Sequence, residues 1–124
     1  MCFMANEYIE PQIADEDIIV YKEGIIVDNY FYPSATGYEY IIDGENPIID
    51  LHVDSDDDIL MIINEGYHSY DATLVEPDDY LYDTVECIIP KGSTYYYYGN
   101  LYVSSNIVIK QKIDKCTFLS TKEN

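Results

Sequence analysis

The chain has 124 residues, of which 24 are acidic and six are lysine, and its formal net charge is -18 at pH 7. This charge excludes direct binding to nucleic acid, which requires Lys and Arg opposite the phosphates, and it disfavours an anionic membrane surface. Hydrophobic residues make up 48% of the chain and 15 residues are tyrosine, whereas disordered acidic chains are poor in aromatic residues. The composition therefore predicts one folded domain over residues 1–124, with frayed ends at about 1–12 and 114–124.

The chain carries no feature of export. Its N-terminus lacks the basic start and apolar segment of a signal peptide, and its longest apolar run, Ile59–Ile63, is too short to span a membrane. The three cysteines, Cys2, Cys87 and Cys116, are widely spaced and form no Cys-x-x-Cys pair. We therefore expect a cytoplasmic protein with reduced thiols, no metal site and no cofactor; a Cys87–Cys116 disulfide is the alternative.

Short β-branched and aromatic runs alternate with turn residues along most of the chain. Turns are expected at Glu23-Gly24, Pro33-Ser34, Asp43-Gly44, Pro90-Lys91-Gly92 and Gly99-Asn100. This spacing predicts a mainly β fold, a small barrel or sandwich of about six to eight short strands. The expected strands are 17–21, 25–30, 38–42, 48–53, 84–89, 94–98 and 106–112.

Residues 55–65 predict one short α-helix. Ser55 is a suitable N-cap, the three aspartates that follow would face the positive end of the helix dipole, and Gly66 would supply the C′ residue. A buried strand over 59–63 is the alternative for this segment, and an α+β fold is the alternative for the chain.

Acidic residues concentrate in the first three quarters of the sequence. Residues 1–90 contain 22 of the 24 acids and a single lysine, Lys22. The densest group is expected to bind a basic protein in place of phosphates, which lie about 1.7 Å apart along a duplex axis. Its members are Asp54, Asp56, Asp57, Asp58, Glu65, Glu76, Asp78, Asp79, Asp83 and Glu86.

Two other interpretations of these acidic residues remain open. One is a solvated coat that only keeps the protein soluble. The other is a calcium loop over 54–58, where oxygen ligands alternate, but this loop lacks the glycine at its sixth position.

The run Tyr95-Tyr96-Tyr97-Tyr98 is the second candidate binding element, together with Tyr102. In a strand, two of the four rings would pack inward and two would lie on the surface, where tyrosine is a common interface residue. The alternative is a tyrosine ladder that only stabilises the sheet.

His68 and Cys87 are the residues that could support catalysis. His68 lies between two tyrosines and next to Ser69, so it could act as a general base. We favour structural roles for both, with the His68 ring bonded to a backbone carbonyl and Cys87 a core thiol. We therefore predict no catalytic residue and no enzyme.

Several stretches from residue 66 onward form recognisable motifs. They are Gly66-Tyr67-His68-Ser69-Tyr70, residues 86–96 around Pro90-Lys91-Gly92-Ser93, and residues 102–109 around Val103-Ser104-Ser105. With these motifs, and with Ile18–Lys22, the chain resembles a loosely defined family of small proteins of Bacteroidetes and their phages. The resemblance implies a phage or mobile-element origin and the cytoplasm of a bacterial host, and it carries no active site.

Charge and resemblance together predict a phage accessory protein that acts by protein–protein binding. In its sharper form it inhibits a host nucleic-acid-handling or defence protein through phosphate mimicry. One alternative is a structural or decoration component of the virion; the second is a small-ligand-binding protein or enzyme that uses His68 and the tyrosines. The expected partner is a basic host or defence protein, or a virion protein, and self-association into a homo-oligomer stays open.

Overall fold

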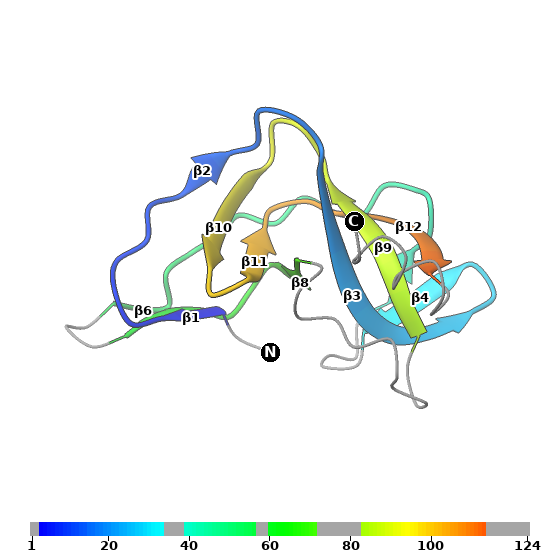
Figure 1. The fold of residues 1–124 in the computed structure, drawn as a ribbon, viewed down its shortest axis with the longest axis horizontal. Helices are drawn as coiled ribbons and strands as arrows, with labels where there is room; N and C mark the ends of the chain where they lie inside the picture. The colour runs from blue at the N-terminus through cyan, green and yellow to red at the C-terminus, as the bar shows by residue number, and fades with distance from the viewer. Residues whose placement is uncertain (1–2, 34–38, 57–59, 72–82, 114–124) are drawn as a thin grey trace, which may run out of the picture.

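The computed structural model describes residues 3–33, 39–56, 60–71 and 83–113, and these residues form two antiparallel β-sheets and no helix (Figure 1). The prediction of a mainly β fold is confirmed. The described residues form twelve strands, where six to eight were predicted. The strands are β1 (Phe3–Ala5), β2 (Gln12–Ile13), β3 (Ile18–Val27), β4 (Tyr30–Pro33), β5 (Tyr40–Ile41), β6 (Ser55–Asp56), β7 (Met61–Ile63), β8 (Tyr67–Tyr70), β9 (Asp83–Ile89), β10 (Thr94–Tyr98), β11 (Leu101–Ser104) and β12 (Val108–Ile113).

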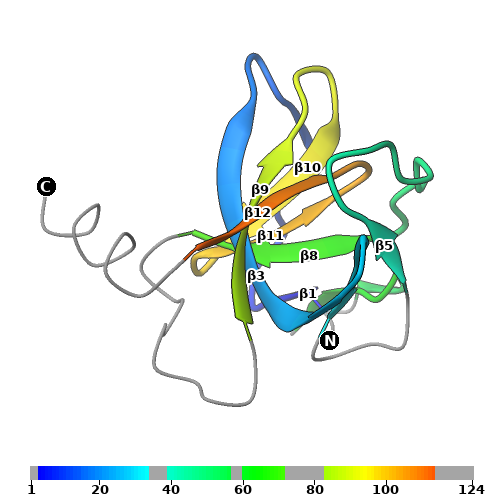
Figure 2. The same cartoon turned by 90° about the vertical axis from the view of Figure 1, so that its right-hand side faces the viewer.

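The large sheet is organised around the long strand β3. Its order is β12-β9-β3-β8-β11-β10-β2, with β4 paired to β3 and β5 paired to β4. In Figure 2, β3 runs beside β9 and then curves at the bottom of the view into its hairpin with β4. A parallel bridge between Ile42 and Ile109 links the β5 end to β12. The sheet therefore curls over its own core in a sandwich-like arrangement, without closing into a barrel.

Gly24 lies inside β3, so the turn predicted at Glu23-Gly24 is wrong. A Cβ atom at this position would lie 2.6 Å from Cζ of Phe31 and 2.3 Å from the carbonyl oxygen of Tyr32. The glycine lets β4 and a core ring approach the strand closely, and this contact depends on tertiary structure rather than on a turn.

Two predicted turns have the backbone that their residues favour. Gly99 and Asn100 both have positive φ angles, 59° and 68°, and join β10 to β11 as a two-residue hairpin loop. In the Pro90–Gly92 turn, Ser93 N donates to the Pro90 carbonyl oxygen at 3.1 Å. The Gly99-Asn100 loop sets the register of β10 against β11, whereas the Pro90–Gly92 turn leads from β9 to β10, which do not pair with each other.

The helix predicted over 55–65 is wrong, because Ser55–Asp56 and Met61–Ile63 are strands that pair with each other. Burial alternates along β7, with Met61 and Ile63 buried and Ile62 half-buried, which is the two-residue period of a strand. On its other edge β7 pairs with β1. The local capping signals were real, but β-branched residues and a strand partner from the N-terminus outweigh them.

Within the N-terminal segment predicted to be frayed, Phe3–Ala5 and Gln12–Ile13 form strands. Phe3 is fully buried and Ala5 nearly so, and β1 completes the small sheet, whose order is β1-β7-β6. The frayed end predicted at 114–124 lies outside the described residues. Residues 48–53, predicted as a strand, have no regular structure, whereas β8 and β11 were not predicted.

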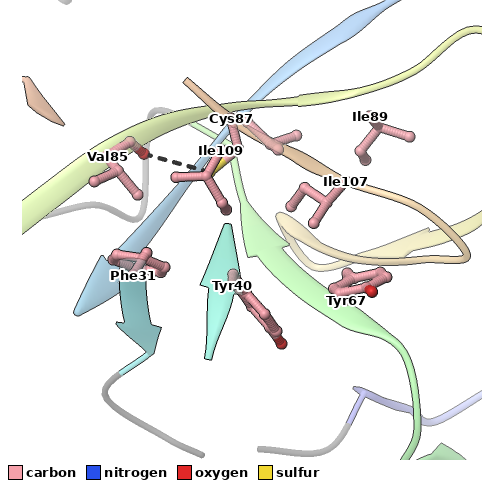
Figure 3. Packing of buried hydrophobic residues seen from close by; sticks show 9 residues of the cluster. Phe31, Tyr40, Tyr67, Val85, Cys87, Ile89, Ile107 and Ile109 are labelled. Carbon is pink, nitrogen blue, oxygen red and sulfur yellow. Dashed lines mark hydrogen bonds between the residues drawn. The ribbon is translucent and has the colours of Figure 1, made fainter. Parts of the chain in front are cut away.

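Two hydrophobic clusters hold the sheets together. The larger one lies under the curled part of the large sheet (Figure 3) and includes Val20, Phe31, Tyr67, Cys87 and Ile109. The smaller one joins the small sheet to β10 and β11 through Phe3, Met61, Ile63, Tyr96 and Val103. No helix in the described ranges is long and apolar enough to cross a membrane.

Candidate functional site

The β10–β11 hairpin separates its tyrosines onto two faces, as the strand pattern predicts. Tyr96 is buried against Phe3, with ring centroids 6.1 Å apart, and Tyr98 packs beside the same cluster. Tyr95 and Tyr97 lie on the opposite face with Tyr102. Tyr96 is therefore a core residue that no partner can reach.

The three rings on the outer face form a contact series. Tyr97 and Tyr102 have ring centroids 4.4 Å apart, and Tyr95 and Tyr102 have centroids 5.9 Å apart. Tyr97 is 38% exposed, while the other two are half-buried. The series offers one accessible ring edge rather than a broad platform.

Hydrogen bonds to the rest of the chain hold these tyrosines in place. The Tyr97 hydroxyl lies 2.9 Å from Asp71 Oδ2, and this bond to the carboxylate raises the pKa of Tyr97 to about 12. The Tyr95 hydroxyl donates to Gln12 Oε1 at 2.9 Å, and the Tyr98 hydroxyl donates to Asn6 Oδ1. These contacts support the alternative interpretation of the tyrosine run, in which the tyrosines form a ladder that stabilises the sheet by holding β2 and β8 to the hairpin.

The structure does not gather the predicted acidic patch into one surface. Asp54 and Glu65 are exposed beside the small sheet, whereas Asp83 and Glu86 are half-buried on β9 of the large sheet. Figure 1 shows β6 and β9 toward opposite ends of the molecule. Asp56 belongs to β6, and the remaining predicted members lie outside the described residues: Asp57, Asp58, Glu76, Asp78 and Asp79.

Acidic side chains nevertheless outnumber exposed lysines on the described surface. No carboxylate whose burial is described is buried, and the exposed acids lie in the loops and turns that connect the strands. The exposed lysines of the described part are Lys91, Lys110 and Lys112. Two of them are already paired, Lys110 with Asp43 and Lys112 with Asp83, each at 3.2 Å. Most of these carboxylates therefore face solvent without a cation.

The remaining described lysine, Lys22, lies in the interior. It is 6% exposed on the core side of β3, its ammonium donates to the His68 carbonyl oxygen, and it sits 5.5 Å from the ring centroid of Tyr40. Burial lowers the pKa of Lys22 to about 8. A backbone carbonyl and an aromatic face compensate this cation only in part, because no described carboxylate forms an ion pair with it.

His68 is packed between two backbone carbonyl groups. Its Nδ1 lies 3.1 Å from the Gly66 oxygen and its Nε2 lies 3.4 Å from the Ile63 oxygen. Burial and the charge of Lys22 lower the pKa of His68 to about 4. A neutral imidazole has one N–H, so only one carbonyl receives a hydrogen bond. The predicted contact between the ring and the backbone is present, and a purely structural role for His68 stays a prediction.

Ser69 and Cys87 are two further buried polar side chains. Ser69 is fully buried, and its hydroxyl has no hydrogen-bond partner among the described residues. Cys87 is a fully buried free thiol whose Sγ lies 3.8 Å from the Val85 carbonyl oxygen (Figure 3), and burial raises its pKa to about 12. A protonated thiol of this kind is a poor nucleophile, consistent with the core role predicted for Cys87.

Sequence reasoning did not anticipate Lys22 in the core or a row of exposed apolar residues at the far end of β3. Residues 18–27 show no alternation of polar and apolar side chains that would have revealed either feature, and the turn predicted at Glu23-Gly24 divided the strand in two.

Nothing in the described ranges groups three or more His, Cys, Asp or Glu side chains as metal ligands. Comparisons with protein-family models, with curated proteins and with solved structures find no match to this chain. The resemblance to small phage proteins therefore stays a prediction.

Proposed function

We propose that this protein acts by binding a basic protein through its acidic surface. The observation that carries the proposal is the excess of exposed carboxylates over exposed lysines, two of which are already paired. A surface of this sign attracts a positively charged partner and accelerates association with it.

In its sharper form, the partner is a host nucleic-acid-handling or defence protein and the carboxylates occupy its phosphate-binding groove. The phage origin expected from the resemblance supports this form. The separation of Asp54 and Glu65 from Asp83 and Glu86 argues for contact over more than one face. The virion component remains the alternative.

The test is capture of the partner from a bacterial host lysate, followed by measurement with the purified partner. Affinity is expected to fall by orders of magnitude between about 50 and 200 mM salt if six or more charges engage, and duplex DNA is expected to displace the protein. Replacing Asp56, Asp57 and Asp58 by asparagine is expected to slow association more than it speeds dissociation. Replacing Asp78, Asp79 and Asp83 by asparagine is expected to have the same effect on association.

The matched control replaces Glu7 and Glu10 by glutamine and Asp15 by asparagine. This variant removes the same charge from exposed positions outside residues 54–86. An equal effect of control and test variants would indicate general charge attraction without a localised groove contact. Binding that ignores both salt and substitution would reduce the acids to a solubilising coat.

A further inference from the structure

The outer face of the β3–β4–β5 end of the large sheet carries a continuous row of apolar side chains. The register pairs Ile25 with Tyr32, Val27 with Tyr30, and Tyr30 with Ile41. Directly paired residues in antiparallel strands project to the same side of the sheet. These five residues, Ile25, Val27, Tyr30, Tyr32 and Ile41, are called the apolar strip below.

The apolar strip faces away from the core. The residues between its members along the chain, Ile26, Phe31 and Tyr40, pack in or against the large hydrophobic cluster. The strip residues instead are exposed, Ile25 by 46%, Val27 by 49%, Tyr30 by 40% and Ile41 by 46%, with Tyr32 half-buried. Scattered single apolar residues need no explanation, but a contiguous row across three strands marks an interaction surface.

Acidic side chains border the apolar strip. Asp28 is exposed in the β3–β4 loop, and Glu39 precedes β5 and accepts a hydrogen bond from the Tyr32 hydroxyl at 2.8 Å. Glu23 lies two residues before Ile25 on the same face of β3 and is half-buried. On the β5 side, Asp43 is already paired with Lys110. An apolar centre with a charged border is the usual anatomy of a protein interface.

The negative charge of this border indicates which kind of molecule binds to the apolar strip. A second copy of the chain would bring Asp28 and Glu39 toward the same carboxylates of its neighbour, with a net charge of -18 on each copy. A protein with apolar side chains at the centre of its contact face and Lys or Arg around them would match both features of the strip.

We propose that the apolar strip is the docking face for a basic protein that inserts apolar side chains between strip residues and places Lys or Arg against Asp28 and Glu39. This inference rests on the proposed function and assigns it a location. The acids attract the partner, and the strip supplies the area that dehydrates on contact and slows dissociation.

Two synthetic peptides of equal charge test the proposal on the full chain. In the first, Lys alternates with Ile and Trp; in the second, Lys alternates with Ser. The first peptide is expected to bind about tenfold more tightly, because each buried apolar side chain adds affinity. Backbone NMR shifts on titration are expected to concentrate in β3, β4 and β5.

The test variant is Val27→Thr with Tyr30→Thr, because threonine keeps β propensity while removing apolar area. The matched control is Ile13→Thr with Ile48→Thr, which removes side chains that are 60% and 74% exposed outside the strip. The test variant is expected to lose the preference for the Ile/Trp peptide and the control to keep it. Thermal unfolding of both variants verifies that each is folded.

These experiments distinguish failure of the docking-face proposal from failure of the proposed function. If both peptides bind equally well and the test variant changes nothing, the strip is not the docking face, while the proposed electrostatic attraction stands. If neither peptide binds, the proposed function fails and the docking face with it. If sedimentation shows a dimer of the chain that the test variant abolishes, the occupant is a second copy and the proposal is overturned.

Discussion

The interior of this protein holds a lysine that most cores would exclude. Lys22 has a backbone carbonyl and the Tyr40 ring as compensating contacts, and burial has lowered its pKa to about 8. At neutral pH the folded state therefore keeps a cation where a neutral side chain would be favoured. The lowered pKa makes the unfolded state bind more protons than the folded state between pH 8 and 10.5.

Stability should consequently rise relative to a Lys22→Met variant as the pH is raised. Between about pH 7 and 10.5 the wild-type chain is expected to gain roughly 3 kcal/mol over Lys22→Met, because one pKa unit corresponds to about 1.4 kcal/mol. Urea unfolding at a series of pH values measures the difference, and contributions from groups that do not interact with Lys22 cancel in it. The Cys87 thiol does not cancel, because the charge of Lys22 lowers its pKa. Lys110→Met, which removes an exposed lysine, is the control and is expected to show no comparable trend.

The pKa of His68 predicts a dependence of the same sign at acid pH. Its folded pKa of about 4 lies below the ordinary value of 6.5, so stability falls as the pH drops through this window, by roughly 3 kcal/mol in total. His68→Gln is expected to remove this component, whereas His52→Gln, at an exposed histidine, is expected to retain it. A wild-type profile that His68→Gln leaves unchanged would contradict the lowered pKa of His68 in the folded state.

Because His68 is buried, we expect His68→Ala to change partner binding by less than about tenfold. Removing its hydrogen bond to a backbone carbonyl is expected to cost roughly 1–2 kcal/mol of unfolding free energy. Complete loss of binding in a stably folded His68→Ala variant would instead indicate a ligand or catalytic site around this residue.

At the level of elements, local sequence signals predicted the strands that carry β-branched runs and the short hairpin loops. Residues 84–89, 94–98 and 106–112 correspond to β9, β10 and β12 within a few positions. They were predictable because β-branched and aromatic runs bounded by turn residues favour strands. The tyrosine run divided its rings between two faces because successive side chains of a strand point to opposite faces.

The elements that sequence reasoning missed depend on distant partners. β1 and β7 pair across 56 or more positions of the sequence, so Met61–Ile63 looked like a helix end and Phe3–Ala5 like a loose terminus. Gly24 similarly looked like a turn because the approach of Phe31 is visible only in three dimensions. For the candidate site, the composition alone shows the excess of acids. Only the strand pairing shows that the predicted acidic patch is divided between the two sheets.

The small sheet makes a sharp prediction about the N-terminal strand. Phe3 is fully buried and Met4, its neighbour, is 53% exposed. Phe3→Ala is therefore expected to lower the unfolding free energy by roughly 3–5 kcal/mol, through lost burial and a residual cavity. Met4→Ala is expected to stay within about 0.5 kcal/mol of wild type. Chemical denaturation of both variants measures the difference, and equal, small effects would mean that β1 is frayed in solution.

The molecule as a whole carries more negative charge than its lysines neutralise, and this has a consequence for stability that is independent of any partner. The folded state holds its carboxylates closer together than the expanded unfolded chain does, so self-repulsion destabilises the fold. Salt screens this repulsion, with a Debye length that falls from about 30 Å at 0.01 M to about 10 Å at 0.1 M.

The melting temperature is therefore expected to rise with NaCl, most steeply below about 0.1 M, where screening changes most. A variant with Asp15→Asn, Glu16→Gln, Glu45→Gln and Asp50→Asn changes four exposed acids. It should be more stable than wild type by roughly 0.5–2 kcal/mol at low salt, and the gap should close at high salt. The matched control exchanges Asp and Glu at the same four positions, which retains the charge and should retain the wild-type salt dependence. If the melting temperatures of the neutralised variant and the control depend on salt in the same way, repulsion among these four acids does not govern stability. The density of acids on the surface then carries no cost in stability that would oppose its use in binding a basic partner.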